Sequence, residues 1–205
     1  GREAVFGALN SGRGRDSQIS PQAGLAFALT PVQELYFNAG VGYHSNDVRG
    51  ATIRTDPASG EPADRVPALV RGRGTELGWR LQPSDDLTVA AALWQLRIDS
   101  ELVYVGDAGA TEPGRASQRR GIEATVRWRA NARWRFEADA AVSRARFRGP
   151  APEGEGQHVD NAPERVFAAG ATYTDGPLSA TLRLRYLGPR DLDTYGTVRS
   201  RANTV

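Results

Sequence analysis

The chain has 205 residues, with 26 basic and 24 acidic side chains, a net charge of +2 and a mean hydropathy of −0.48. It has no cysteine, which excludes disulfides and thiolate metal sites within it. It also has no lysine, since all 26 basic residues are arginine, which excludes a Walker lysine and a Schiff-base lysine. The charges form no basic tail, which disfavours nucleic-acid binding, and no apolar run approaches the roughly 18 residues of a membrane-spanning helix.

Alternation of apolar and polar residues with a period of two predicts β-strands along most of the chain. In chain order the predicted strands cover residues 4–9, 17–29, 35–43, 72–81, 87–105, 122–129, 134–142, 163–174 and 178–186. In the 134–142 strand, for example, Trp134, Phe136 and Ala138 alternate with Arg135 and Glu137. This pattern is typical of a strand with one apolar and one polar face.

The 87–105 strand is longer than the others. Its predicted apolar face carries Trp94, Leu96, Ile98, Leu102 and Tyr104, and its predicted polar face carries Gln95, Arg97, Asp99 and Glu101. A tilted strand crosses a bilayer in about 9–11 residues, so we expect the remainder to project beyond the membrane as a hairpin arm.

Short and long connections alternate along the chain. Short turns are predicted at 30–33, 82–85, 130–132 and 174–177, where Pro, Gly, Asn and Asp favour turns. Polar loops rich in Gly and Pro are predicted at 10–16, 44–71, 106–118, 149–162 and from 188 onward. In an up-and-down barrel every second connection lies on the same rim, so this order indicates short periplasmic turns and long extracellular loops.

These patterns predict an all-β fold, a portion of an antiparallel up-and-down transmembrane β-barrel with about nine strands in the cell outer membrane. The predicted lumen-facing charges are Arg97, Asp99, Glu101, Arg127, Arg129, Arg135, Glu137, Asp139, Arg183 and Arg185. The aromatic residues expected in the girdles at the membrane interfaces are Tyr36, Tyr43, Trp79, Trp128, Trp134, Tyr173 and Tyr186. A passive porin, another kind of barrel and a soluble β-sandwich binding module are alternatives.

Several motifs in order resemble the C-terminal part of the β-barrel of TonB-dependent outer-membrane receptors. They are the segments 34–50, with its Tyr43-His-Ser-Asn-Asp-Val-Arg-Gly50 end, 75–80, 100–107 leading to 114–123, 161–165 and 184–189. Such barrels have about 22 strands around a plugged lumen. The resemblance implies that residues 1–205 are a partial receptor barrel, with the plug domain and the terminal strands outside this fragment.

The resemblance also implies a function. Extracellular loops of the family capture a nutrient such as an iron chelate or cobalamin, which enters with energy from the TonB-ExbB-ExbD system acting through the plug. The expected environment is a monomeric barrel in contact with outer-membrane lipid and lipopolysaccharide. The sequence offers no catalytic residue pair on adjacent strands, so we expect no enzyme activity and no cofactor.

Loop residues with Arg, His, Asp or Tyr side chains are the candidate ligand contacts, because guanidinium groups bind carboxylate and phosphate-like oxygens in pairs. These candidates are His44, Asn46, Asp47, Arg49, Arg65, Tyr104, Asp107, Arg115 and Arg119. A metal site at His158 is disfavoured, although Glu153, Glu155 and Asp160 lie near it in sequence, because Gly and Pro interrupt the segment. Charged loops also serve simply as solvated surface.

Overall fold

The computed structural model describes residues 10–46, 48–56, 59–100, 102–105 and 110–205. The strands are β1 (Gln22–Thr30), β2 (Gln33–Ser45), β3 (Leu69–Ser84), β4 (Leu87–Ile98), β5 (Leu102–Val105), β6 (Ala110–Pro113), β7 (Ser117–Arg129), β8 (Trp134–Phe147), β9 (Arg165–Asp175), β10 (Leu178–Leu187) and β11 (Asn203–Thr204), with helix α2 at Val48–Thr52. Among the described residues no helix has the length and hydropathy needed to span a membrane.

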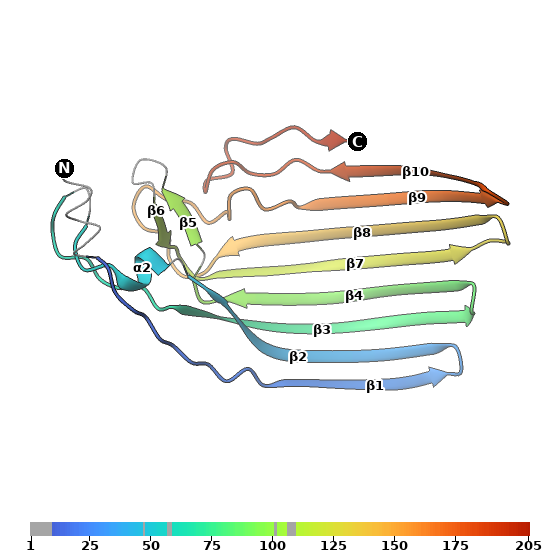
Figure 1. The fold of residues 1–205 in the computed structure, drawn as a ribbon, viewed down its shortest axis with the longest axis horizontal. Helices are drawn as coiled ribbons and strands as arrows, with labels where there is room; N and C mark the ends of the chain where they lie inside the picture. The colour runs from blue at the N-terminus through green and yellow to red at the C-terminus, as the bar shows by residue number, and fades with distance from the viewer. Residues whose placement is uncertain (1–9, 47, 57–58, 101, 106–109) are drawn as a thin grey trace.

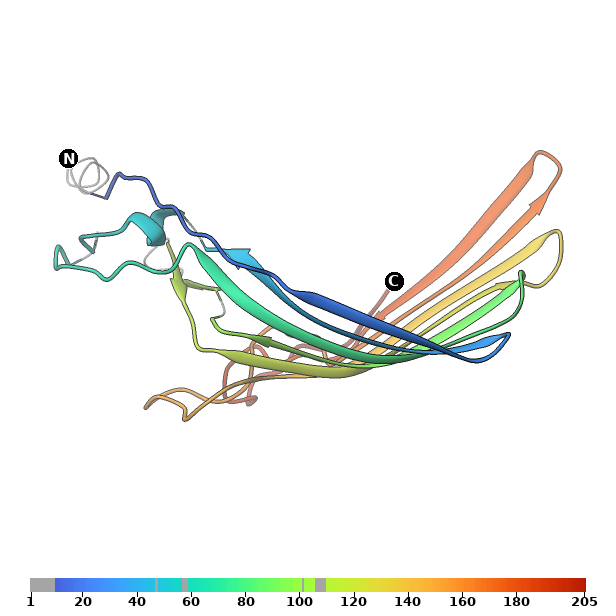
Figure 2. The same ribbon diagram turned by 90° about the horizontal axis from the view of Figure 1, so that it is seen from below.

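Nine of these strands form one antiparallel sheet in the order β1-β2-β3-β4-β7-β8-β9-β10-β11. Figure 1 shows the consequence for the connections: the short turns lie together at one end of the sheet and the long loops lie at the other. Seen from its edge, the sheet is strongly twisted and curved (Figure 2). The alternation of connection lengths therefore sorts the loops to one rim, as the sequence predicted.

Most predicted strands are present and several are longer than predicted. The strands predicted at 72–81 and 134–142 are observed as the longer strands β3 and β8, which continue further toward the loop end. Residues 17–21, predicted to belong to the first of the described strands, lie outside β1. The prediction of a hairpin arm after β4 is confirmed, because β5 and β6 pair with each other in a separate two-stranded sheet. The strand predicted at 4–9 lies outside the described residues, and β11 is the ninth strand of the observed sheet.

The strand register divides the sheet into two faces. Residues paired across neighbouring strands share a face, and one such row runs Leu77, Leu93, Ile122, Val142. We call this side the apolar face. Its large side chains are exposed, including Leu25, Phe27, Leu182 and Leu184, as expected of a surface that meets lipid. The opposite side is the polar face.

Aromatic rings gather on the apolar face near the short turns. Trp128 and Phe136 are paired in the register, with ring centroids 5.5 Å apart, and Trp134 stacks on Phe136 at 5.8 Å. Tyr173, opposite Trp134, lies 5.0 Å from its ring. This cluster has the position of an interfacial aromatic girdle. Tyr36, which the sequence placed in the same group, lies instead on the polar face.

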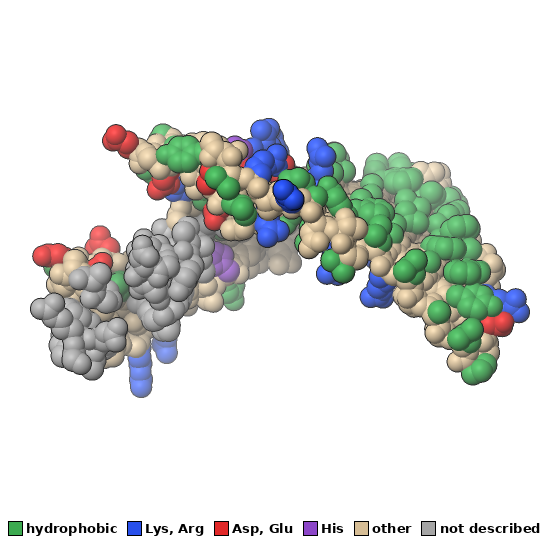
Figure 3. All heavy atoms as spheres, turned by 90° about the horizontal axis from the view of Figure 1, so that it is seen from above, with side chains coloured by type: hydrophobic (Ala, Val, Ile, Leu, Met, Phe, Trp, Pro, Cys, Tyr) green, Lys and Arg blue, Asp and Glu red, His purple; other side chains and the backbone are tan. Residues whose placement is uncertain are grey.

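Residues buried from solvent lie mainly at the loop end. Ala145 and Phe147 of β8 pack with Val159 of the following loop to form a small apolar cluster, which Ala162 covers in part. The strand region has little internal core because a single sheet has no second layer to cover it. Figure 3 shows hydrophobic side chains spread over the turn half of the molecule, with arginines gathered toward the loop half.

Candidate functional site at the loop end of the sheet

The polar face is covered by charged groups that pair across strands. Glu34 of β2 and Arg80 of β3 are 3.3 Å apart, and Arg127 of β7 reaches Asp139 of β8 at 3.0 Å. Glu34 and Arg80 sit opposite each other in the register, so the strand pairing itself brings these charges together. The prediction that Arg127 and Asp139 share the polar face with Arg129, Arg135, Glu137, Arg183 and Arg185 is confirmed by the strand pairing.

Glycines on the polar face make room for large neighbours. The ring of Tyr36 lies over Gly78, where an added Cβ would come within 2.0 Å of the ring. The ring of Trp94 covers Gly121 in the same way, because a Cβ added at Gly121 would lie 2.8 Å from Trp94 Cζ2. Glu137 lies over Gly170, and it reaches across β9 to Arg183 of β10 at 3.5 Å. The bulky side chains of the lumen thus lie flat against the strands next to them.

The predicted faces of the second half of β4 are wrong. Trp94, Leu96 and Ile98 lie on the polar face, because Leu93 pairs with Leu77 and Ile122 on the apolar face and side chains alternate along a strand. Arg97, predicted to face the lumen, therefore lies on the apolar face. Asp99 also belongs to that side, where its carboxylate binds Arg73 at 2.8 Å. β4 carries apolar residues on both faces, so its own sequence does not define which face meets lipid.

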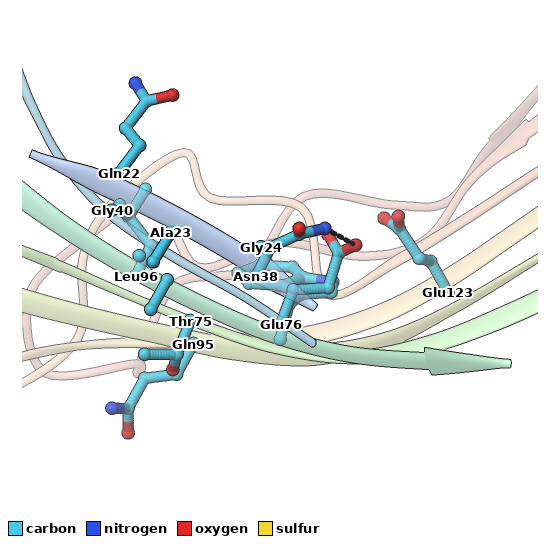
Figure 4. Close-up of a pocket in the computed structure, with 13 residues that line it drawn as sticks. Gln22, Ala23, Gly24, Asn38, Gly40, Thr75, Glu76, Gln95, Leu96 and Glu123 are labelled. Carbon is cyan, nitrogen blue, oxygen red and sulfur yellow. Dashed lines mark hydrogen bonds between the residues drawn. The ribbon is translucent and has the colours of Figure 1, made fainter. Parts of the chain in front are cut away.

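A hollow of about 560 Å³ lies along the middle of β1–β4. Figure 4 shows Asn38 and Glu76 joined by a hydrogen bond of 3.5 Å on the polar side, with Glu123 on the same side of the sheet. The indole Nε1 of Trp94, which also lines this hollow, is buried without a hydrogen-bond partner among the described residues. The hollow presents the acceptor oxygens of Asn38, Glu76 and Glu123 toward the lumen.

Two of the predicted ligand contacts, His44 and Asn46, lie where β2 reaches the loops. The ring of His44 is on the polar face and its Nε2 lies 3.3 Å from the carbonyl oxygen of Ser100. Asn46 is buried, and its side-chain amide donates to the carbonyl of Pro67 at 2.7 Å. Asn46 therefore ties the end of β2 to the segment before β3, whereas His44 borders the open lumen.

Arg115 joins two long loops. Its guanidinium donates to the carbonyl of Gly156 at 2.7 Å and to Gln157 Oε1 at 2.9 Å, and it lies 4.8 Å from the ring centroid of Phe147. Glu155 is a further ionic partner at 3.5 Å. These contacts give Arg115 a structural role in holding the 149–157 segment.

Arg119 has a different position, on the polar face of β7 at the loop end. Its Nη1 donates to Ser117 Oγ at 3.2 Å. Among the other predicted contacts, Arg65 is exposed in the loop before β3, and Arg49 and Tyr104 belong to α2 and β5. Asp47 and Asp107 lie outside the described residues. His44 and Arg119 are thus the two predicted contacts seen to border the lumen.

The loop that follows β10 is held by a network that the sequence analysis missed. Asp191, with 6% of its surface exposed, accepts a hydrogen bond from His158 Nδ1 and forms an ion pair with Arg199 Nε at 3.0 Å. Arg199 also reaches Glu164 at 2.8 Å. No periodic pattern marks these residues, because they come from two loops, the one between β8 and β9 and the one after β10. In the described residues no three His, Asp or Glu side chains are arranged to hold a metal ion.

A second carboxylate, Asp193, orders the turn at the tip of this loop. It accepts hydrogen bonds from the Thr197 hydroxyl and from the amides of Thr197 and Val198 at 2.9 and 3.1 Å. The Thr197 side chain is the main cause that lowers the pKa of Asp193 below its ordinary value.

Comparison with known proteins identifies the barrel type. The family model described as "TonB dependent receptor-like, beta-barrel" matches residues 2–205. The structure resembles the ferric yersiniabactin uptake receptor FyuA of Yersinia pestis, with a TM-score of 0.72 and 17% identity over 94% of this chain and 29% of FyuA. It also resembles the ferric-catecholate import receptor Fiu of E. coli K12, with a TM-score of 0.63 and 18% identity over 89% of this chain and 27% of Fiu.

The copper transporter OprC is similar in the same way, with a TM-score of 0.66 and 16% identity over 91% of this chain and 30% of OprC. No curated protein matches the sequence. The chain spans less than a third of the length of each of these three structures. At these identities the likeness to the solved structures concerns the fold.

Proposed function

Since this chain belongs to the TonB-dependent receptor β-barrel family of the outer membrane, a family of transporters and not of enzymes, we propose that it forms part of a receptor for nutrient import. The loops capture a small ligand at the cell surface, and TonB-derived energy drives its passage. A metal chelate is the ligand class that we favour, because the similar structures are named for ferric yersiniabactin, ferric catecholate and copper. Cobalamin or a similar nutrient is the alternative cargo.

The observation that carries this proposal is the separation of the two faces together with the gathering of the long loops at one rim. The apolar face exposes large side chains to lipid, while the polar face lines a charged lumen. A soluble β-sandwich would cover one face of this sheet with a second sheet. In the described residues nothing covers the apolar face, so lipid is its expected surrounding.

His44 and Arg119 are the residues that we propose to contact the ligand. Both lie on the polar face where strands meet the loops, and each is partly exposed. A guanidinium on the polar face at the loop end suits the carboxylate or catecholate oxygens of a ferric chelate. Arg115 and Asn46 donate to backbone carbonyls of the neighbouring loops, and we assign them a structural role.

The partners follow from the same proposal. The plug domain would lie against the polar face, where the acceptor oxygens of Glu76 and Glu123 face the lumen, and it would connect the barrel to the TonB-ExbB-ExbD system. Outer-membrane lipid and lipopolysaccharide would surround the apolar face of a monomeric barrel.

The proposal is tested in the full-length receptor that contains this segment. Purified protein is titrated with ferric catecholate, ferric hydroxamate, ferric citrate and cobalamin, and binding is followed by tryptophan fluorescence. We expect one class to bind, and Arg119→Gln to weaken that binding about tenfold to a hundredfold, the value of a lost hydrogen bond to a charged group. His44→Ala should also weaken it.

Arg133→Gln is the matched control, because Arg133 pairs with Asp175 at the short-turn end, far from the ligand. It should leave binding unchanged. Uptake of the bound ligand should stop in cells that lack TonB. Uptake that persists without TonB would instead identify a passive porin, and binding of none of the four ligands would contradict the receptor proposal.

A further inference from the structure

Three large apolar side chains of β4 lie on the polar face, which lines the lumen. Trp94, Leu96 and Ile98 alternate with the lipid-facing residues of β4, and each of the three is only partly buried. The large side chains nearer the short turns are mostly charged, for example Arg80 and Arg127. Apolar surface that stays in water forgoes the stabilisation that burial gives, so these three residues, here called the lumen patch, favour a partner that covers them.

Glycines beside the lumen patch leave a hollow next to it. The adjoining positions of the polar face on β3 and β2 are all glycine, namely Gly72, Gly74, Gly40 and Gly42. None of the four has a positive φ, and β2 pairs with β3 without a bulge, so the backbone itself does not require glycine there. The hollow of about 560 Å³ lies against this part of the sheet, with Gly40, Gly74 and Leu96 in its lining.

Contacts between the described residues do not explain these glycines either. A Cβ added at Gly42 or at Gly74 would meet nothing within 4 Å, and one added at Gly72 would make only ordinary contacts, the nearest at 3.8 Å. Gly78 differs, because the ring of Tyr36 occupies the space above it. A strand glycine that is neither strained nor crowded marks a place where a ligand or another backbone comes close. The hollow beside the lumen patch is therefore room for an external group.

The charges around the lumen patch suit a group that has an uncharged part and anionic oxygens. Arg119 is the register partner of Leu96 on the side away from the glycines, and it is partly exposed. Toward the short turns, the next two rows of the polar face bring Glu76 and then Glu123. Figure 4 shows this order along the sheet, with Leu96 followed by Glu76 and then by Glu123. Anionic oxygens are thus attracted at Arg119 and repelled at the carboxylates, while β1–β4 carry no charge on this face at the level of Leu96.

A planar aromatic ring matches this arrangement better than an aliphatic chain does. The bare backbone of the glycines lets a flat ring approach the sheet closely, and Leu96 and Ile98 cover the edge of the ring. Oxygens attached to the ring then reach Arg119, which is one strand beyond Leu96 at a strand spacing of about 4.8 Å. The volume of the hollow lies within the range of roughly 300–1,000 Å³ that is usual for small-molecule sites. An aliphatic chain has no flat face to place on the bare backbone.

We propose that the lumen patch and the glycines beside it form a subsite for an aromatic ring of the imported ligand, so that the receptor selects an aryl-bearing chelate over an aliphatic one. This inference rests on the proposed receptor function and adds the chemical class of the ligand to it. Arg119 binds the oxygens of the chelate, Leu96 and Ile98 cover the ring, and the glycines leave the place of the ring open.

The test compares two ferric chelates that bind iron through the same atoms. Ferric benzohydroxamate and ferric acetohydroxamate both have hydroxamate donors and no net charge, but only the first carries aromatic rings. Their binding to the full-length receptor is measured by titration calorimetry, together with the binding of a ferric catecholate and of ferric citrate. Heat-modifiable gel mobility verifies that each variant is folded.

Gly74→Leu fills the place of the ring, and Leu96→Ala removes part of its cover. Thr75→Leu is the matched control, because it adds the same side chain to the neighbouring residue of β3 on the opposite face. We expect the wild type and Thr75→Leu to bind ferric benzohydroxamate about tenfold more tightly than ferric acetohydroxamate, the value of covering one face of a ring. Gly74→Leu should abolish this difference. Leu96→Ala should reduce it about threefold, and it serves as the test if Gly74→Leu does not fold.

Equal binding of the two hydroxamates by the wild type, or a ring preference that survives in the folded variants, would overturn the proposal. An equal loss for both hydroxamates in Gly74→Leu would also overturn it, because the leucine would then obstruct the lumen as a whole. A less stable Gly74→Leu receptor with an unchanged ring preference would show that the plug covers this wall instead. Tightest binding of ferric citrate, an aliphatic chelate, would overturn the ring subsite and leave the receptor proposal intact, whereas binding of none of the chelates would overturn both.

Discussion

Replacing Gly78 with alanine should destabilise the barrel, because the new methyl group would overlap the ring of Tyr36. The ideal Cβ position lies 2.0 Å from Tyr36 Cζ and 2.3 Å from its Oη, well inside any van der Waals contact. To relieve the overlap, the ring must leave its place beside Arg80, whose guanidinium lies 5.7 Å from the ring centroid. Overpacking of this kind costs about 1–3 kcal/mol, against a gain of about 0.5–1 kcal/mol from replacing a strand glycine.

The expected net loss of about 1–2 kcal/mol is measured on the full-length receptor in lipid bilayers, from the denaturant dependence of tryptophan fluorescence. Gly74→Ala is the matched control, since Gly74 lies on the same face of the same strand and a Cβ added there would meet nothing within 4 Å. This control should be neutral or slightly stabilising. In the Tyr36→Ala background, Gly78→Ala should no longer destabilise the protein.

A double-mutant cycle over these two residues gives the result that decides the matter. We expect a coupling free energy of about 1–3 kcal/mol between Tyr36 and Gly78, as for residues in direct contact. If Gly78→Ala costs the same with and without the tyrosine ring, the ring does not lie over Gly78 and the reasoning about the polar face is refuted.

Three further predictions concern the loop end and the girdle. Asp191→Asn should loosen the loop after β10 by about 1–3 kcal/mol, because it removes the carboxylate that Arg199 contacts at 3.0 Å, and limited proteolysis should then cut this loop faster than in the wild type. The turn at Asp193 should be fully stabilised above the ordinary pKa of 3.8 and lose this stability as the pH falls through its lowered pKa, so a carboxylate NMR titration should show a midpoint below 3.8 that Thr197→Ala raises. Trp134→Ala should lower the stability in bilayers by about 1–2 kcal/mol through its two ring contacts, and a denaturation midpoint equal to that of the wild type would contradict the girdle assignment.

The strand pattern and the ligand candidates were predictable to different degrees. Period-two alternation and turn residues located β1–β4 and β7–β10, because each signal is local to its segment, whereas β11 lies where a loop was predicted. Two of the ligand candidates, Arg115 and Asn46, are bound to neighbouring loops. Which loop residue faces the lumen depends on contacts between segments far apart in sequence.

The sequence by itself determined the element type, the order of short and long connections, and hence one rim rich in loops. It could not decide which side chains of β4 face the lipid, because alternation defines two faces without saying which one is outside. The pairing of Leu93 with Leu77 and Ile122 shows which face of β4 meets lipid. Arg120 and Arg144 are separated by 24 positions in the chain, and only the register of β7 and β8 places them opposite each other. Tertiary structure decided these features because strand pairing, unlike strand formation, depends on residues distant along the chain.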